Sequence, residues 1–246
     1  MGTTRGFRIS ESPEFFNRIA NDSRVFPWVS QDGAPPIDLT GAWPTCIGLE
    51  FGDEGGWLVQ RVGLLDYEVH TLFVPGENKA RIHLRDALTF MFCNTACERL
   101  VTKIPSDLRA ASKLADIAGF SEIFNRENAW LRHGHRLTVS YRELTVDRWI
   151  VGDEALRKAG SDFHAKLVAF GHDVGHAEDP IHDAYVGYAV TCSLAGLEPK
   201  GVDVYNRWAS FAGYMPIELE NNSVTFEGIV VRAGLKGIEL SRAVRH

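Results

Sequence analysis

The sequence predicts an α+β protein, in which a mixed sheet flanked by helices is followed by a small C-terminal domain of helices and strands. Residues 67–74 and 99–104 are short runs of β-branched, aromatic and apolar side chains, as in buried strands. Residues 80–92 between them carry apolar side chains at helical spacing. Because a single helical crossover joins parallel neighbours, these two strands should pair in parallel.

The segments before this unit predict the antiparallel part of the sheet. Residues 7–10 predict a short strand, and Ser12 predicts the N-cap of a helix whose first residue is Pro13. Residues 45–51 and 57–62 predict two further strands, joined by a glycine-rich hairpin turn. A meander that leads into a parallel crossover makes the sheet mixed.

The segments after the crossover complete the first domain. Residues 107–118 predict a second helix, and Gly119 stands where a helix needs a left-handed C-cap. Residues 121–125 and 135–141 predict two more strands, with a turn at residues 133–134 between them.

The chain is expected to form two domains, residues 1–150 and residues 151–246. In the second, apolar side chains first recur at helical spacing, and short strands follow. Helices are expected over residues 156–170, 180–196 and 202–212, and strands over 217–220, 224–232 and 237–240. The expected core of this domain comprises Leu156, Phe163, Leu167, Trp208 and Phe211.

Composition indicates an ordinary globular protein and excludes some partners. Of the 246 residues, 45% are hydrophobic and 24% charged, and the net charge of −6 gives no support for a nucleic-acid partner. We expect no membrane association, because no apolar run reaches the length of a membrane span. The four cysteines lack the two-residue spacing of a zinc knuckle, which predicts free thiols.

Residues 108–120, LRAASKLADIAGF, carry a resemblance to a known family. They resemble the fourth-helix signature of the GNAT (Gcn5-related N-acetyltransferase) fold, which ends in Gly-Phe. The order of strands and helices over residues 1–150 agrees with that resemblance. It implies acyl-CoA binding in the gap where the strands 67–74 and 99–104 splay apart.

The resemblance also implies where the cofactor would lie. Its thioester would rest against main-chain groups of Leu72, Phe73 and Val74. Its pyrophosphate would sit at the N-terminus of the helix over residues 80–92, where free N–H groups favour anions. The residues implied there are Lys79, Ala80 and Arg81.

Three departures from the family's pattern argue against a working enzyme. The phosphate loop has no glycine after Gly76, whereas the family's loop is rich in glycine. Leu108 occupies the position of the signature Asn. Ala115 occupies the position of the general-acid Tyr and cannot protonate a leaving thiolate.

Two polar side chains on the strand 67–74 are candidate catalytic bases. Glu68 and His70 lie on a strand that should face the cleft. The alternative is that they are ordinary half-exposed strand side chains. No metal site is expected: His172 and His176 have a chelating spacing only within a helix, and the glycines beside them disfavour one.

A second resemblance covers most of the chain. Residues 196–202, together with Tyr205-Asn206-Arg207-Trp208 and Phe211-Ala212-Gly213-Tyr214, resemble GNAT-like head-assembly proteins of short-tailed phages. The resemblance implies other phage structural proteins, or further copies of this chain, as partners. It implies a location in the virion or the host cytoplasm.

The sequence therefore leads to a phage virion-assembly or structural protein on an acyl-CoA-type scaffold that has lost its catalytic groups. On this hypothesis no cofactor is expected. The alternative is an active acetyl-CoA-dependent N-acetyltransferase that acts on a protein or a small amine. A CoA-binding module without catalysis is the third hypothesis, and the sequence leaves open whether the protein is an enzyme.

Overall fold

A computed structural model shows that the chain divides into two compact units, residues 1–145 and residues 146–246. The division comes five residues before the boundary expected from the sequence, and each unit is described by itself. The structure describes residues 6–76, 79–169, 180–194, 199–200, 202, 205–206, 209–210, 217–220, 223–226, 229–234 and 237–242. Within these residues, no helix combines the length and the apolar character that a membrane crossing requires.

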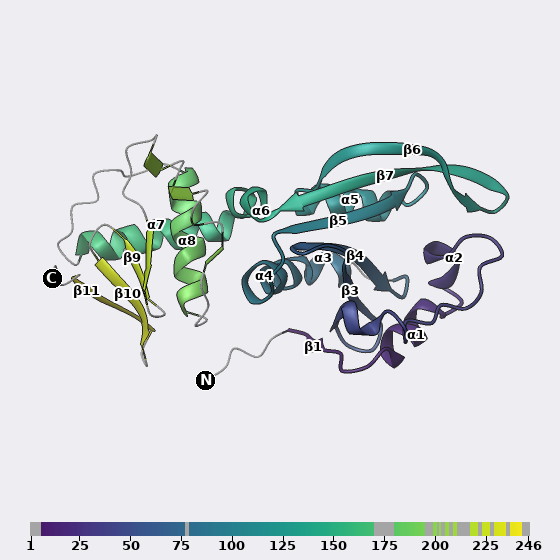
Figure 1. Cartoon of the computed structure of the whole chain (residues 1–246), viewed down its shortest axis with the longest axis horizontal. Coiled ribbons are helices and arrows are strands. Elements are labelled where there is room, and N and C mark those ends of the chain that lie inside the picture. The colour runs from purple at the N-terminus through teal and green to yellow at the C-terminus, as the bar shows by residue number, and fades with distance from the viewer. Residues whose placement is uncertain are drawn as a thin grey trace. The chain divides into compact units, whose positions relative to one another are not determined.

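Unit 1 is a seven-stranded sheet with helices, and its elements appear in Figure 1. The strands are β1 (Arg8–Ile9), β2 (Cys46–Glu50), β3 (Gly55–Arg61), β4 (Asp66–Phe73), β5 (Arg99–Pro105), β6 (Ser121–Arg132) and β7 (His135–Thr145). The helices are α1 (Glu14–Ala20), α2 (Phe26–Val29), η1 (Trp43–Thr45), α3 (Lys79–Ile82), α4 (Leu84–Asn94) and α5 (Arg109–Ala118).

The sheet is mixed, as predicted. Its strand order is β1-β2-β3-β4-β5-β7-β6, so β7 inserts between β5 and the β6 that precedes it in the chain. β4 and β5 pair in parallel, and the other paired strands of this sheet are antiparallel. The parallel crossover predicted from the sequence is therefore confirmed, and it lies at the centre of the sheet.

Two helix predictions need correction. The helix expected over residues 80–92 is broken into α3 and α4 at His83, whose φ of −94° and ψ of 1° leave the helical region. The His83 ring stacks on Phe51 with 4.3 Å between ring centroids, a tertiary contact that the apolar periodicity does not reveal. At α1, Pro13 rather than Ser12 holds the N-cap position, and no side chain caps this helix.

The end of α5 is confirmed in detail. Gly119 adopts the left-handed conformation, with φ of 87°. The Phe120 N–H donates to the Ala115 carbonyl at 3.0 Å and the Gly119 N–H to the Asp116 carbonyl at 3.1 Å, the two bonds of a Schellman motif. This turn directs the chain from α5 into β6.

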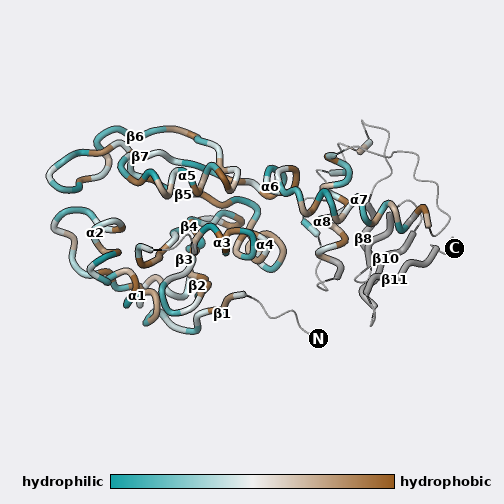
Figure 2. The backbone as a smooth tube through the Cα atoms, turned by 180° about the vertical axis from the view of Figure 1, so that it is seen from behind, coloured by the Kyte–Doolittle hydropathy of each residue, from teal (hydrophilic) through white to brown (hydrophobic). Residues whose placement is uncertain are grey.

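The β6–β7 hairpin is longer than predicted, and most of its first strand is exposed. Figure 2 shows the hairpin in predominantly hydrophilic colours. The predicted turn is confirmed, because His133 and Gly134 both have positive φ angles. Their N–H groups donate to the Asp32 carboxylate at 2.9 and 2.7 Å, and these two bonds lower the pKa of Asp32.

Unit 2 combines helices with a separate four-stranded antiparallel sheet. Its described elements are α6 (Val146–Gly152), α7 (Glu154–Ala169), α8 (Pro180–Leu194), β8 (Ile217–Glu220), β9 (Ser223–Phe226), β10 (Ile229–Gly234) and β11 (Gly237–Arg242). The single strand expected over residues 224–232 is instead the antiparallel pair β9 and β10. Most of the helix expected over 202–212 lies outside the described residues.

The core of unit 2 is described in part. Leu156 and Phe163 are buried as predicted, whereas the side chains of Leu167, Trp208 and Phe211 lie outside the described residues. α7 and α8 approach so closely that a Cβ on Gly160 would come within 1.9 Å of the Asp183 carbonyl oxygen. The two helices therefore contact each other backbone to backbone. All four cysteines lie among the described residues and carry thiols rather than disulfides, as the sequence predicted.

Candidate functional site

The central feature of unit 1 is a gap between β4 and β5. The two strands pair only from Asp66 to Glu68 on β4. At this closed end of the gap, Arg99 forms an ion pair with the Asp66 carboxylate, with 2.8 Å between the guanidinium nitrogen and the carboxylate oxygen. Beyond that point, the Thr102 hydroxyl donates to the Val69 carbonyl at 3.2 Å in place of a strand-to-strand bond. The predicted splay of the parallel pair is thus present.

Strand geometry tells which main-chain groups face this gap. The Val69 carbonyl points towards β5, while the Val74 N–H points the other way and donates to Glu54 at 2.8 Å. Because successive residues of a strand direct their polar groups to opposite edges, Thr71 and Phe73 share the direction of Val69. Among the described residues, no strand pairs with β4 along the stretch that their N–H and C=O groups face.

The two faces of the sheet at the gap differ in the helices that cover them. Thr102 is the cross-strand partner of Arg142, whose guanidinium binds the α5 carboxylate of Asp116 at 2.5 Å, so this face lies towards α5. The neighbouring residue Lys103 pairs with Tyr141 and lies on the opposite face. We call these the α5 face and the charged face.

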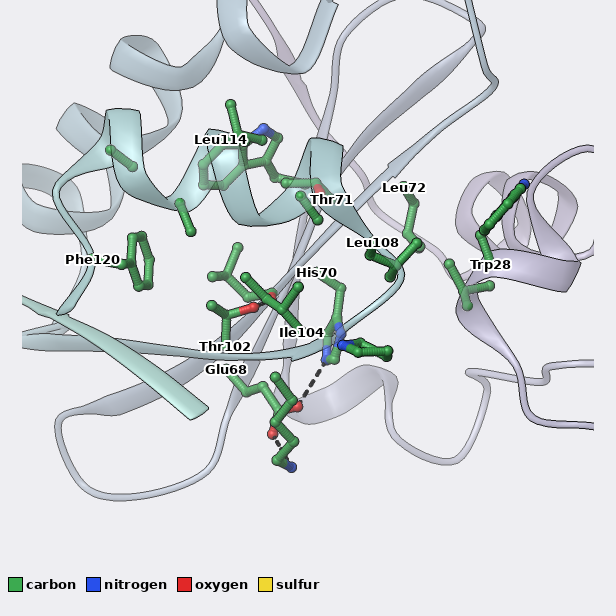
Figure 3. Close-up of a pocket in the computed structure, with 18 of the residues that line it drawn as sticks. Trp28, Glu68, His70, Thr71, Leu72, Thr102, Ile104, Leu108, Leu114 and Phe120 are labelled. Atoms are coloured by element: carbon green, nitrogen blue, oxygen red, sulfur yellow. Dashed lines mark hydrogen bonds and ion pairs between the residues drawn. The ribbon is translucent and has the colours of Figure 1, made fainter. Parts of the chain in front are cut away.

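An inner pocket of about 290 Å³ occupies the gap and opens to both faces. Figure 3 shows its labelled residues: Glu68 and His70 project from β4 towards one another, and Leu114 and Phe120 approach from α5 and the turn after it. The lining residues are Trp28, Val29, Trp57, Glu68, Val69, His70, Thr71, Leu72, Leu84, Thr102, Lys103, Ile104, Pro105, Leu108, Ala111, Leu114, Ala115, Ala118, Phe120 and Trp130.

The charged face of the pocket contains a carboxylate between two nitrogen groups. The Glu68 side chain keeps 12% of its surface exposed, and its Oε2 accepts from Lys103 Nζ at 2.7 Å. Its Oε1 lies 3.5 Å from His70 Nε2. Glu68 and Lys103 therefore form a close ion pair, and His70 completes the cluster towards the pocket.

His70 lines the pocket with 42% of its side-chain surface exposed. Desolvation lowers the pKa of its imidazole, with Lys103 acting in the same direction and Glu68 opposing them, and this direction favours the neutral form at neutral pH. The imidazole therefore has a nitrogen lone pair available at neutral pH. A neutral histidine next to a carboxylate can accept a proton and keep the resulting charge paired.

A second, outer groove of about 510 Å³ runs along α5 towards the start of α3. Its basic side chains are Arg81 and Lys113, both exposed. Thr71, Ala111 and Leu114 line both this groove and the inner pocket, so the two spaces adjoin each other. The remaining lining residues are Phe73, Val74, Pro75, Gly76, Ala80, Ala110 and Ile117.

The α5 wall of the inner pocket is apolar throughout. It consists of Leu108, Ala111, Leu114, Ala115 and Ala118. Two of the departures seen in the sequence therefore lie in the pocket: Leu108 holds the N-cap position without a capping side chain, and Ala115 is buried. No hydroxyl group comes from this wall to protonate a leaving group.

Two tryptophans of the pocket carry unused hydrogen-bond donors. Among the described residues, the buried Nε1 atoms of Trp57 and Trp130 have no hydrogen-bond partner, and Trp57 is only 2% exposed. A buried donor without a partner costs about 1–3 kcal/mol. Trp57 is the cross-strand partner of Thr71, which places it beside the free main-chain groups of β4.

A buried arginine connects several residues on one side of the pocket. Arg132 is 2% exposed and binds the Asp107 carboxylate and the Trp28 carbonyl, each at 2.7 Å. Its guanidinium also lies 5.7 and 5.8 Å from the rings of Trp28 and Trp130. The arginine thus fixes the indole of α2 and the indole of β6 around one side of the pocket.

The structure brings most of the sequence-predicted residues together. Glu68, His70 and Leu72 line the inner pocket, and Phe73, Val74, Ala80 and Arg81 line the outer groove. The Lys79 side chain, the loop at Glu77 and the two histidines considered for a metal lie outside the described residues. Among the residues the structure does describe, no three His, Cys, Asp or Glu side chains gather as a metal ion requires.

Sequence reasoning missed five residues of the site. They are Trp28, Trp57, Lys103, Lys113 and Trp130. Lys113 could have been found, because it lies on the predicted helix that the resemblance places next to the cofactor. The other four come from strands and a short helix whose approach depends on the folded sheet, and no local pattern marks them.

Comparison with known proteins gives structural neighbours only. No family model and no curated protein matches the chain. A spermidine N-acetyltransferase from Vibrio cholerae, solved with CoA and spermine, is similar at 13% identity, over 58% of this chain and 96% of that one, with a TM-score of 0.49. A candidate phosphinothricin N-acetyltransferase is similar at 15% identity, over 57% and 97%, with a TM-score of 0.48.

A candidate acetyltransferase from Acinetobacter baylyi is similar at 16% identity, over 57% of this chain and 93% of that one, with a TM-score of 0.48. The strand order and the single splayed parallel pair give unit 1 the GNAT-like α+β fold that the sequence predicted.

Proposed function

We propose that unit 1 binds an acyl-CoA and transfers the acyl group to an amine, which is the N-acetyltransferase alternative of the sequence analysis. One observation carries the proposal: the pocket in the gap between β4 and β5, which is lined by Glu68 and His70, adjoins a groove with basic side chains. The first space suits a phosphorylated cofactor, and the second suits an amine that must lose a proton.

The cofactor would lie along β4 and α5. Its pantetheine amides would pair with the main-chain groups of Thr71 and Phe73, which face the gap. Its phosphates would lie near Arg81 and Lys113, whose positive charges the groove presents. Of the three main-chain positions predicted from the sequence, this proposal uses Phe73, because strand alternation directs the main-chain groups of Leu72 and Val74 towards β3.

The reaction would use both faces of the pocket. His70, supported by Glu68, takes a proton from the acceptor ammonium, and the free amine then attacks the thioester carbon. The Trp57 indole N–H and the Thr71 main-chain N–H are donors for the oxyanion of the tetrahedral intermediate. The attacking nitrogen then gives up its second proton to solvent, the C–S bond breaks, the new C–N bond remains as an amide, and the thiolate leaves.

The departures seen in the sequence still constrain this reaction. With Ala115 in the wall, no side chain of α5 protonates the thiolate. A positioned general acid contributes about a hundredfold or more in rate. We therefore expect slow turnover in which departure of the thiolate limits the rate, because the proton held by His70 must travel to the sulfur or the thiolate must leave charged.

Calorimetry tests the cofactor site. Acetyl-CoA titrated into the protein should bind at a single site, and the double variant R81E/K113E should lose more than tenfold in affinity, because two attractive charges become repulsive. Lys166→Glu changes the charge of an exposed lysine in unit 2 and should leave the affinity unchanged. If acetyl-CoA does not bind, the expectation that no cofactor is used stands instead.

The virion-assembly role stays a prediction from sequence resemblance. No contact, surface or comparison described above bears on it. Detection of the polypeptide in purified phage particles would support that role, and it is compatible with acyl-CoA binding. Transfer of an acyl group to an amine by the purified protein would show that the scaffold is an active enzyme.

A further inference from the structure

The α5 wall of the inner pocket is lined by three alanines where larger side chains could stand. Ala111, Ala115 and Ala118 are spaced four and three residues apart, so they lie on one face of the helix. All three line the pocket, and Ala115 is only 6% exposed. Their small side chains leave space between α5 and the gap.

The space is larger than the reaction with acetyl-CoA requires. The inner pocket holds about 290 Å³. A water molecule takes about 30 Å³ of liquid volume, so an acetyl group of three heavy atoms would fill a minor part of the pocket. The amine would approach from the charged face, where Glu68 and His70 lie, which leaves the α5 face to the donor.

The α5 face is also suited to hydrocarbon. Alternation along β5 places Ile104 on the same face as Thr102, and Trp57 and Phe120 add two aromatic rings. Ile104, Phe120 and Trp57 are all at least nine-tenths buried. Among the pocket-lining residues on this side, no side chain is charged.

We propose that the donor of this protein is an acyl-CoA whose acyl chain is longer than acetyl, a straight alkanoyl chain of about four to eight carbons that lies against Ala111, Ala115 and Ala118. The occupant follows from the fact that the two spaces adjoin: Thr71, Ala111 and Leu114 line both the pocket and the outer groove, so a chain attached to a cofactor in that groove would extend into this pocket. The inference rests on the proposed function, because it requires acyl-CoA in the outer groove.

The transfer step is the same as for acetyl. The thioester C–S bond breaks, a C–N bond forms, the amine loses one proton and the CoA sulfur leaves as thiolate. No oxidant or further reactant is needed. Chain length changes only the apolar surface removed from water, and each buried methylene contributes about 0.8 kcal/mol, or roughly fourfold in affinity.

Calorimetry with CoA, acetyl-CoA, butanoyl-CoA and hexanoyl-CoA on the whole chain tests the proposal. Affinity should rise with each pair of carbons, and hexanoyl-CoA should bind about two-hundredfold more tightly than acetyl-CoA. Ala115→Leu should remove most of this gain and leave the affinity for CoA itself unchanged, because it fills only the inner pocket. Ala118→Val is the milder variant if Ala115→Leu does not fold.

Ala110→Leu is the matched control, because Ala110 lies on the same helix but lines only the outer groove. It should change the affinities for all four ligands equally and preserve the chain-length gain. Equal binding of acetyl-CoA and hexanoyl-CoA, or a gain that survives both Ala115→Leu and Ala118→Val, would overturn the proposal and leave the proposed function standing. Absence of CoA binding altogether would overturn both.

Discussion

The two faces of β4 differ in character although they alternate along one strand. Residues 68 and 70 place a carboxylate and an imidazole on the charged face, together with Lys103 from β5. Val69 and Thr71 lie on the α5 face, where the pocket is lined by alanines and aromatic rings. In a closed sheet these faces would be separated, but the splay of β4 and β5 opens both into one pocket.

On the proposed function, the two faces would have separate roles. Proton transfer would take place on the charged face, where the polar groups pair with one another. The acyl donor would be bound on the α5 face, where apolar surface predominates. Substitutions on the charged face should therefore change turnover, whereas those on the α5 face should change donor binding or stabilisation of the oxyanion.

The largest effect is expected from Glu68→Gln. If Glu68 supports the proton transfer, kcat should fall by about a hundredfold to ten-thousandfold while the affinity for acyl-CoA changes little. Glu143→Gln is the control, because Glu143 is a partly exposed carboxylate that binds Arg99 at 3.4 Å and does not line the pocket. Steady-state kinetics with an aryl or alkyl amine measures both. An unchanged kcat in Glu68→Gln would remove the catalytic role of the charged face.

The next largest effect is expected from Trp57→Phe, a substitution on the α5 face. The change keeps an aromatic ring and removes the buried indole N–H that has no partner among the described residues. Loss of one oxyanion donor lowers kcat by on the order of a hundredfold. Binding of acyl-CoA, measured by calorimetry, should stay within about twofold. If affinity falls instead and kcat does not, Trp57 acts only in binding.

The pKa of His70 should shift in opposite directions in two variants of the charged face. Glu68 raises this pKa and Lys103 lowers it, so Glu68→Gln should lower the pKa further and Lys103→Met should raise it. Titration of the imidazole by NMR measures both shifts. Because burial holds the wild-type pKa below 6.5, protonation of His70 should reduce the rate only as pH falls below that value. Equal shifts in the two variants would contradict the arrangement of charges.

The smallest effect is expected at the closed end of the gap. Arg99 pairs with Asp66 and Glu143, but its side chain keeps 44% of its surface exposed. Exposed ion pairs contribute about 0–1 kcal/mol, so Arg99→Ala should lower the free energy of unfolding by less than about 1 kcal/mol. Urea unfolding provides the measurement. A loss of several kcal/mol would show that this ion pair, and not the strand pairing, determines where the splay begins.

The sequence by itself determined the local structure around the gap. The β-branched run of β4, the helical spacing in α5 and the left-handed turn at Gly119 all depend on neighbours a few residues away, and all three were predicted. The parallel pairing of β4 and β5 followed from the single helical crossover that connects them. The departures at Leu108 and Ala115 were also visible, because the helix fixes their positions relative to Gly119.

Only the tertiary structure decided which distant side chains meet. The break at His83 depends on a ring that stacks on Phe51, thirty-two positions earlier in the chain. Lys103 forms an ion pair with Glu68 because the fold places β5 beside β4 at the point where their pairing ends. In the sequence, Ala115 indicates only that the general-acid hydroxyl is missing. In the folded protein, its small side chain also leaves space in the inner pocket. Periodicity reports only the nearest turns of the chain, whereas burial, charge pairing and pocket volume arise from contacts across the sheet.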